Sequence, residues 1–249
     1  MSSDKNILII CEGNDEKKLL EILFDVYPIK ISFKIFSYGT NIYLLRKHIF
    51  ENYIEKGFKI DEIDIISLLR EYREDEVLKQ KFTDILFIFD LEPQDPRFSF
   101  EHIVSMQEIF SESTNQGQLY LNYPMFESVL DFDEIPDPNY QYKKVMLETI
   151  PRNGYKNRVR RTSALKGIER INAENLPILM KQTIEKFEYI SKDDNFNYLD
   201  LLINQIQLIN NENSVWVINT SILFLKDFNH ELFLEYINYL ELSSRDIDI

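Results

Sequence analysis

Four carboxylates follow two short apolar segments of the sequence. Glu12 comes directly after the run ILIIC, and Glu16 comes four residues later. Asp90 comes directly after the run ILFIF, and Glu92 comes two residues later. Carboxylates that share a site repel one another unless they are protonated or bound to a cation, and oxygen ligands without histidine or cysteine favour Mg²⁺ or Mn²⁺. The predicted chemistry is that of a divalent cation that orients a phosphodiester, activates water and stabilises the leaving oxygen.

This chemistry requires the two apolar runs to be neighbouring strands of one sheet. Short continuous apolar runs are typical of buried parallel strands, and sites in open α/β sheets form at the carboxyl ends of the strands. Asn14 or Asp15 can cap a helix that follows the first strand. The pattern predicts further strands at 30–37 and 119–121, and helices at about 42–56, within 61–80 and at 100–110. Strands that alternate with helices predict a three-layer α/β domain with a mostly parallel sheet.

Each of these carboxylates also has a purely structural interpretation. A glutamate such as Glu12 at a helix start is often only a partner of the helix dipole. An aspartate such as Asp90 after an apolar strand often caps a turn or a helix, and Glu16 equally suits a solvated helix face. Two such signals occur at strand ends about eighty residues apart. Together they favour a shared site more strongly than either signal does alone.

The rest of the chain differs in pattern from this first part. The turn-rich segment DEIPDPNY (133–140) predicts that an α/β domain ends near residue 135. Residues 136–249 are mainly helical in pattern, apart from the strand-like run VWVI at 215–218, and we interpret them as a helical C-terminal extension. The many aromatic residues of this extension are typical of core positions.

Composition narrows the class of protein. The chain has 249 residues, of which 44% are hydrophobic, so it can build a sizeable core. Only 6 glycines argue against a glycine-rich phosphate loop, and the single cysteine, Cys11, excludes an intramolecular disulfide and a cysteine-based zinc cluster. No apolar stretch is long enough for a membrane span or a signal peptide, so we expect a cytoplasmic protein without a membrane partner.

The charge distribution bears on nucleic-acid binding. A formal net charge of −14 has the wrong sign for extended binding to phosphates, which lysine and arginine must neutralise. Positive charge is nevertheless concentrated between residues 152 and 170. We therefore expect that segment to line the approach to the carboxylates, through Arg158, Arg160, Arg161 or Lys166. An ordinary solvated helix is the alternative interpretation.

Two segments together resemble a Toprim domain, the topoisomerase–primase fold that also occurs in OLD-family and RloB-like nucleases. They are ILIICEGNDEKKLL and DILFIFDLEPQDP, and the resemblance covers about residues 5–132. In that family a glutamate after the first strand and a DxD motif after a later strand bind the catalytic metal. The resemblance therefore implies that Glu12, Asp90 and Glu92 are metal ligands. Glu16 matches a second acid of the OLD-like group.

A third segment extends this resemblance. LYLNYPMFESVLDF is similar to the NPxFE-type stretch of RloB-like proteins, which implies roles for Asn122 and Glu127. Glu92 stands where the family has an aspartate, so its ligand atoms lie about one methylene further out. Asp95, three residues on, is an alternative ligand.

Three functions remain after the sequence is considered. The leading one is a Toprim-type, metal-dependent nuclease for RNA or DNA, with Glu12, Asp90, Glu92 and Glu127 as catalytic residues; the resemblance implies a role in bacterial antiphage defence. The second is a catalytically degenerate Toprim-like module that binds a nucleic acid, a nucleotide or a partner protein. The third is a haloacid-dehalogenase-like phosphatase with Asp90 as nucleophile, which the following Glu92-Pro93 disfavours. The expected partner is a nucleic-acid substrate, and a partner protein or a homo-oligomer remains open.

Overall fold

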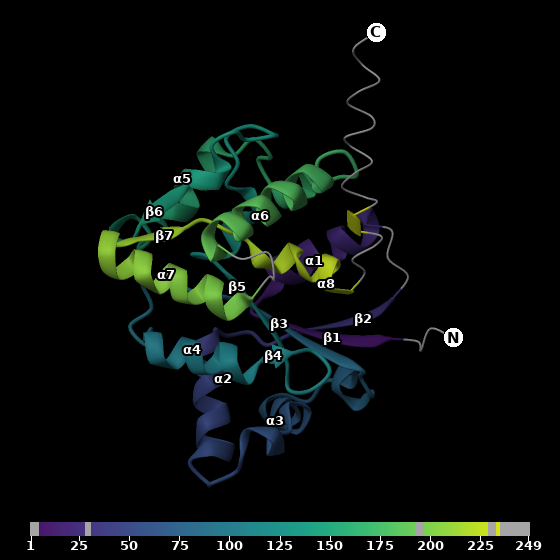
Figure 1. Cartoon of the computed structure of the whole chain (residues 1–249). Coiled ribbons are helices and arrows are strands. Elements are labelled where there is room, and N and C mark those ends of the chain that lie inside the picture. The colour runs from purple at the N-terminus through teal and green to yellow at the C-terminus, as the bar shows by residue number, and fades with distance from the viewer. Residues whose placement is uncertain (1–4, 28–30, 193–196, 229–232, 235–249) are drawn as a thin grey trace.

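A five-stranded sheet with the strand order β2-β1-β3-β5-β4 organises the chain (Figure 1). Its strands are β1 (Asn6–Cys11), β2 (Ser32–Ser37), β3 (Asp84–Asp90), β4 (Ser111–Glu112) and β5 (Gly117–Asn122). All neighbours are parallel except the short edge strand β4, which runs antiparallel to β5. The computed structural model describes residues 5–27, 31–192, 197–228 and 233–234. The predicted α/β class with a mostly parallel sheet is confirmed.

The two apolar runs form the centre of this sheet. Every residue of β1 after Asn6 is buried, and β3 is buried except for the half-exposed Ile85. Continuous burial on both faces explains why these strands are apolar throughout rather than alternating. β1 pairs with β3 in a register that sets Cys11 opposite Ile88. Both strands therefore end at the same edge of the sheet.

Helices cover both faces of the sheet (Figure 1). α1 (Asn14–Val26) lies on one face, and α2 (Ile42–Ile49), α3 (Ile65–Tyr72) and α4 (Phe100–Ile109) lie on the other. The helix expected at 42–56 ends its regular part at Ile49 and continues as a wider π-helical turn, Phe50–Ile54. The helix expected within 61–80 is only eight residues long, because the side chain of Asp64 caps its start and that of Asp75 caps a separate 3-10 turn.

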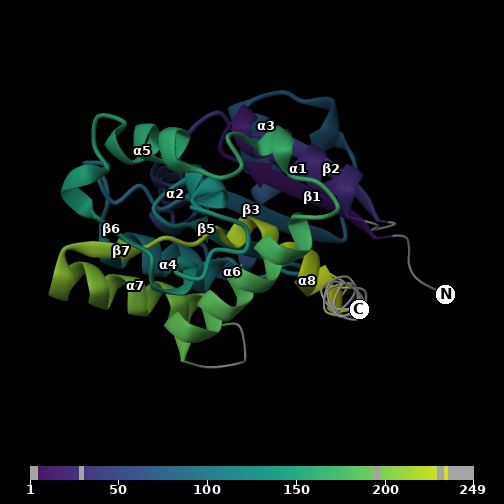
Figure 2. The same cartoon turned by 90° about the horizontal axis from the view of Figure 1, so that it is seen from above.

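Within the described residues, the C-terminal part adds four α-helices and a small second sheet. The helices are α5 (Gly154–Thr162), α6 (Leu176–Ser191), α7 (Tyr198–Glu212) and α8 (Phe224–Phe228). β6 (Lys144–Met146) pairs antiparallel with β7 (Ser214–Trp216), beside α5, α6 and α7 (Figure 2). The strand-like run at 215–218 thus contributes β7. β6 was not expected, since three residues with one buried side chain carry almost no periodic signal.

This C-terminal part is joined directly to the end of β5. The backbones of Ile218 and Tyr123 exchange two hydrogen bonds of 2.9 Å each. Thr220 Oγ1 donates to the Leu121 carbonyl oxygen at 2.8 Å. The predicted boundary near residue 135 stays a prediction, but the chain beyond it stabilises the sheet edge before it. Within the described ranges, no helix combines the length and the apolarity needed to cross a membrane.

Gly117, the first residue of β5, is a position where the fold needs glycine. Its φ is +120°, and an added methyl group would collide with the Phe87 ring. Gly57, in the turn after the π-helical segment, has a φ of +84° with open space around it. We expect Gly57→Ala to cost about 1–2 kcal/mol of unfolding free energy through backbone strain. Gly117→Ala should cost a further ~1–3 kcal/mol through overpacking.

Urea unfolding of both variants measures this difference. Equal losses of unfolding free energy would show that the Phe87 ring moves aside without cost, and would contradict the packing described for β3 and β5.

Candidate active site

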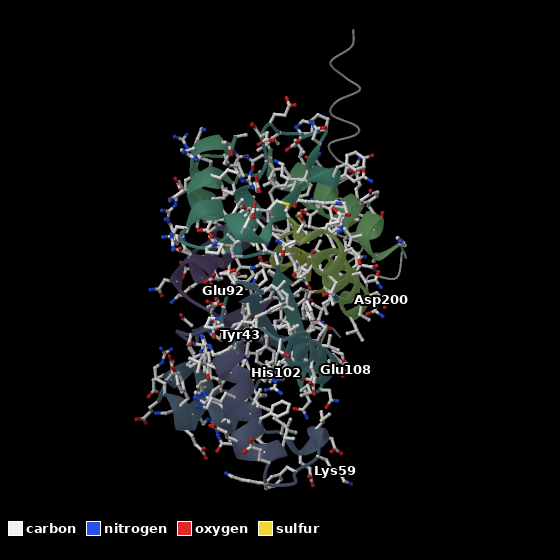
Figure 3. All side chains as sticks on the ribbon, turned by 90° about the vertical axis from the view of Figure 1, so that its left-hand side faces the viewer. Tyr43, Lys59, Glu92, His102, Glu108 and Asp200 are labelled. Atoms are coloured by element: carbon white, nitrogen blue, oxygen red, sulfur yellow. The ribbon has the colours of Figure 1, made fainter. Side chains whose placement is uncertain are left out.

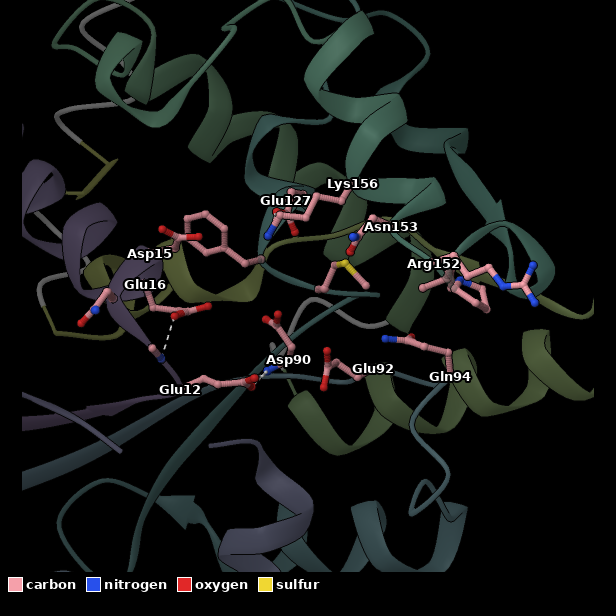
Figure 4. A pocket seen from close by; sticks show the side chains of 16 residues that line it. Glu12, Asp15, Glu16, Asp90, Glu92, Gln94, Glu127, Arg152, Asn153 and Lys156 are labelled. Carbon is pink, nitrogen blue, oxygen red and sulfur yellow. Dashed lines mark hydrogen bonds and ion pairs between the residues drawn. The ribbon is translucent and has the colours of Figure 1, made fainter. Parts of the chain in front are cut away.

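A cavity of about 420 Å³ opens at the carboxyl ends of β1 and β3 (Figure 4). Its walls are the turn between β1 and α1, the loop after β3, the 3-10 helix after β5 and the chain that leads into α5. Six carboxylates and two cations line it: Glu12, Asp15, Glu16, Asp90, Glu92, Glu127, Arg152 and Lys156. The structure brings five of the six acidic candidates from the sequence together in one place, all but Asp95, and adds Asp15.

Glu12 and Asp90 are held side by side by the pairing of β1 with β3. Glu12 extends the ladder past β1, because its backbone N–H donates to the Ile88 carbonyl oxygen at 3.2 Å. The backbone N–H of Asp90 in turn donates to Glu12 Oε2 at 3.4 Å. Asp90 is buried, and its Oδ1 accepts a hydrogen bond of 3.2 Å from Asn122 Nδ2. Asn122 is itself fixed, since its Oδ1 accepts from the Ser221 backbone N–H at 3.3 Å.

Glu16 occupies the first turn of α1 in a buried position. Its Oε2 accepts a hydrogen bond of 2.8 Å from the backbone N–H of Gly13, which precedes the helix (Figure 4). The side chain thus satisfies a backbone donor at the helix start, as the glutamate of a capping box does. A solvated helix face is the wrong interpretation for Glu16, because the side chain is buried in the cavity wall. A ligand role stays a prediction.

Glu92 is positioned by a tight loop after β3. Its φ of +42° turns the chain, and its backbone N–H donates to the Pro124 carbonyl oxygen at 2.9 Å. The preceding N–H, of Leu91, donates to the Asn122 carbonyl oxygen at 3.0 Å. Tyr43 of α2 donates its hydroxyl hydrogen to the Leu91 carbonyl oxygen, and Figure 3 shows Tyr43 close to Glu92. The loop is therefore tied to two other elements.

Asp95, the alternative ligand, has other partners. Its carboxylate forms a two-pronged ion pair with Arg97, at 2.9 and 2.7 Å. It also accepts a hydrogen bond of 3.0 Å from Asn41 Nδ2. Asp95 is not among the residues that line the cavity, so the geometry favours Glu92 as the second acid of the motif.

Glu127 and Lys156 form an ion pair on the wall opposite β1. Glu127 lies in the 3-10 helix Phe126–Leu130, is 5% exposed and lines the cavity, as the sequence predicted. Its Oε1 lies 2.5 Å from Lys156 Nζ of α5. Without a ligand, the lysine therefore neutralises one of the site's carboxylates.

The basic candidates from the sequence lie outside this lining: Arg158, Arg160, Arg161 and Lys166. Arg158 instead binds the buried carboxylate of Asp131, at 3.1 Å from Nη1 and 2.5 Å from Nη2. The other three are exposed, and Lys166 Nζ donates to the Arg161 carbonyl oxygen at 3.1 Å. Contact of these residues with nucleic acid stays a prediction. At the cavity wall itself, Arg152 and Lys156 of the same segment carry the positive charge.

Asp131 anchors the helix that carries this charge. Besides Arg158, it accepts a hydrogen bond of 3.0 Å from the Tyr155 hydroxyl group. Lys143 Nζ lies 3.5 Å from its carboxylate and donates to its backbone carbonyl oxygen at 3.0 Å. A buried carboxylate with this many donors fixes the start of α5. Arg158 therefore positions a wall of the cavity rather than facing into it.

Sequence reasoning missed Arg152 and Lys156 as cavity residues. Arg152 and Asn153 adopt left-handed backbone conformations, with φ of +54° and +61°, that turn the chain into α5. Lys156 lies one helical turn before Arg160 and therefore on the same side of the helix. Both cations belong to the basic segment that was recognised, but only the orientation of α5 decides which of its residues face the carboxylates.

Burial and mutual repulsion raise the pKa values of the clustered carboxyl groups. Burial, followed by the charges of Glu92 and Glu16, raises the pKa of Glu12 to about 8. Burial, with Glu12 and Glu16, raises the pKa of Asp90 well above its usual range. Burial is also the main cause that raises the pKa values of Glu16 and Glu92. The cluster therefore favours protonation or a cation, and strongly shifted groups that gather in a cavity are typical of functional sites.

The donor atoms fit a hard divalent cation. Carboxylate oxygens line the cavity, and the amide of Asn122 holds Asp90 in place. Yet in the part of the chain that the structure describes, no three Asp, Glu, His or Cys side chains already stand in a metal-ligating arrangement. Binding of Mg²⁺ or Mn²⁺ would thus require Glu12, Asp90 and Glu92 to rotate toward a common point.

Comparison with known proteins adds no relative. No protein family, curated protein or solved structure matches this chain. The resemblance to Toprim proteins therefore stays a prediction, and the site has to be judged by its own geometry.

The shifted pKa of Glu12 predicts how stability depends on pH. Because this pKa rises from 4.5 to about 8 on folding, the native state binds more protons than the unfolded state in that range, and stability falls as pH rises through it. Glu12→Gln removes this effect. We expect the metal-free variant to be more stable than the wild type at pH 8, by on the order of 1–2 kcal/mol, and the difference to shrink toward pH 5.

Urea unfolding across this pH range is the measurement. Glu21→Gln, at an exposed position of α1, is the matched control and should follow the wild-type pH dependence. Parallel curves for wild type and Glu12→Gln would show that Glu12 is an ordinary surface carboxylate.

Proposed function

We propose that this chain is a divalent-metal-dependent nuclease with a Toprim-like site, which hydrolyses phosphodiester bonds of RNA or DNA. One observation carries the proposal: the carboxylates at two adjacent strand ends, Asp90 buried and Glu12 half-buried, line a single cavity together with two cations. A purely structural cluster of acids gains nothing from such mutual repulsion, whereas a site for a cation and a phosphate needs both signs of charge. A cytoplasmic role in bacterial antiphage defence belongs to this proposal through the resemblance alone.

The carboxylates form the cation side of the proposed site. Glu12, Asp90 and Glu92 would hold Mg²⁺ or Mn²⁺, with Glu16 at the base of the cluster. When bound, such a cation orients the phosphate and lowers the pKa of a water molecule. Asn122 holds the Asp90 carboxylate through its amide group. If Glu12 does not bind the cation, it is instead the candidate general base, since a carboxyl group with a pKa of about 8 accepts a proton readily once charged.

The opposite wall forms the anion side of the proposed site. Lys156 and Arg152 line the cavity, and Figure 4 shows Lys156 reaching to Glu127 while the Arg152 guanidinium group points away from the carboxylates. In a partly buried cavity a positive charge stabilises a phosphate more strongly than a surface charge does. Lys156 and Arg152 are therefore the cations that this acidic chain places at the wall of the proposed site.

The alternative of a catalytically degenerate module rests on a specific observation. Glu127 is already paired with Lys156 at 2.5 Å, and the described side chains hold no preformed ligand set. Thermal unfolding with and without Mg²⁺ or Mn²⁺ separates the two functions. A metal site gives a stabilisation that grows with cation concentration, about 2.7 kcal/mol at a hundred times the dissociation constant. A degenerate site gives none.

Cleavage should depend on the metal and on Asp90. Purified protein is incubated with tRNA, single-stranded and duplex substrates in the presence of Mn²⁺, Mg²⁺ or EDTA. We expect cleavage with a divalent cation, no cleavage in EDTA, and a rate for Asp90→Asn lower by roughly 100-fold or more. Asp61→Asn, an exposed position outside the cavity lining, should retain wild-type activity. Absence of cleavage from every substrate, or full activity of Asp90→Asn, contradicts the proposal.

Arg152 should contribute more to substrate binding than the exposed arginines of α5. Only Arg152 lines the cavity, whereas Arg160 and Arg161 lie outside the lining. We expect Arg152→Ala to weaken binding and to reduce the salt dependence by about one phosphate contact. The double variant Arg160→Ala/Arg161→Ala should lose less affinity at moderate salt. Binding of the preferred substrate in EDTA across a salt series measures both effects, and an unchanged affinity and salt slope for Arg152→Ala would remove it from the site.

A further inference from the structure

A second, smaller cavity lies between α6 and α7. It has a volume of about 270 Å³, and we call it the Tyr189 groove. The lining residues that matter here are Tyr189, Lys192, Asn204, Gln207, Asn211 and Trp216. Tyr189 is 41% exposed, which is a large exposure for an aromatic ring in a folded chain. The groove belongs to the C-terminal part and shares no lining residue with the carboxylate cavity.

The aromatic rings around the groove stand at right angles to one another. The Tyr189 ring lies 5.6 Å from the Trp216 ring at an interplanar angle of 90°. Tyr142, 59% exposed, lies 5.5 Å from Tyr189 at 87°. Lys144 Nζ lies over the Trp216 ring at 4.4 Å and is paired with Glu212 at 2.7 Å. The exposed surface available for stacking is therefore that of the two tyrosines rather than of the indole.

Side-chain amides form the other side of the groove. Asn204, Gln207 and Asn211 follow one another at intervals of three and four residues, so they lie along one face of α7. Asn204 Nδ2 donates to the Asp200 carbonyl oxygen at 2.9 Å, so this donor is already used within α7. Amides offer both donors and acceptors. A flat ring with polar edges, such as a nucleobase, can stack on tyrosine and hydrogen-bond to such amides at once. Lys192, in the same lining, adds a positive charge for a phosphate.

The groove is linked to the carboxylate cavity through β6. Lys144 of β6 is paired with Trp216 of β7, and the chain then runs through Met146 to Ile150, which lines the cavity. Ile150 follows Lys144 by six positions, so their Cα atoms lie at most about 21 Å apart. A nucleic-acid strand of a few nucleotides covers this separation.

We propose that the Tyr189 groove binds an unpaired base of the nucleic-acid substrate, and so makes the enzyme prefer single strands over duplex. This inference rests on the proposed nuclease function and names its substrate class. A base inside a duplex is stacked on both faces and hydrogen-bonded at its edge, so it cannot enter the groove. A single strand presents its bases to aromatic rings without such a cost.

The protein carries its own reporter for this inference. The sequence has a single tryptophan, and it lies in the groove as Trp216. Binding of the full chain is therefore followed by intrinsic fluorescence in EDTA, where no cleavage occurs. The probes are a single-stranded oligonucleotide, a blunt duplex of the same sequence, and a mononucleotide. A labelled oligonucleotide followed by fluorescence anisotropy provides the second measurement.

We expect the single strand to change the tryptophan fluorescence at concentrations at which the duplex and the mononucleotide do not. Tyr189→Ala should weaken single-strand binding roughly 5- to 150-fold, the range for loss of one stacked base. Tyr189→Phe keeps the ring and should bind like the wild type. Tyr72→Ala is the matched control, since Tyr72 is a tyrosine of similar exposure, 44%, on α3.

The outcomes separate this inference from the proposed function. Three results would each overturn the groove assignment. The first is that the duplex binds as tightly as the single strand, and the second is that the mononucleotide does so. The third is that Tyr189→Ala binds the single strand as tightly as the wild type. Cleavage can depend on the metal and yet proceed equally in the Tyr189→Ala variant and the wild type, and equally on single strands and duplex. In that case only the groove assignment fails. If Tyr189-dependent binding of single strands is seen without cleavage under any condition, only the nuclease assignment fails.

Discussion

The parallel strands β1 and β3 at the centre of the sheet end beside each other. Glu12 follows β1, and Asp90 is the last residue of β3. The register that sets Cys11 opposite Ile88 leaves no freedom in this respect, because Glu12 continues the ladder and the Asp90 backbone points at its side chain. A buried acid and a half-buried acid that close together are unfavourable as a pair of charges. Much of the surrounding structure supplies what the pair lacks: an amide from Asn122, a capped helix start, and positive charge from α5.

The C-terminal part is needed to complete this arrangement. It fixes Asn122 through the backbone of Ser221, and it closes the end of β5 through the pairing of Ile218 with Tyr123. It also carries α5, which is anchored on the buried Asp131. A fold in which the first part stood alone would leave the Asn122 amide unsupported and the cavity without its cations. The extension is therefore a structural component of the site as well as an addition to the domain.

The sequence was most informative where one physical signal dominated. Continuous apolar runs located β1 and β3, and acids at their ends located the cavity, because parallel strands place their carboxyl ends at one edge. It was least informative where the answer depended on orientation. Which cations of the basic segment line the cavity depends on where α5 lies, and that position depends on the contact between Arg158 and the buried Asp131. The strand β6 likewise depends on a tertiary neighbour, β7, that no local pattern encodes.

The ion pair between Glu127 and Lys156 has a consequence for how ligands would bind together. Each partner occupies the group that a ligand of the opposite sign would use. A cation that draws Glu127 away leaves the Lys156 ammonium group for an anion, and an anion that draws Lys156 away leaves the carboxylate for a cation. Thermodynamic reciprocity then requires each ligand to strengthen the binding of the other by the same factor. The single ion pair of 2.5 Å between Glu127 and Lys156 is therefore sufficient to couple the binding of a cation to the binding of an anion. No movement of the sheet beneath the cavity is needed.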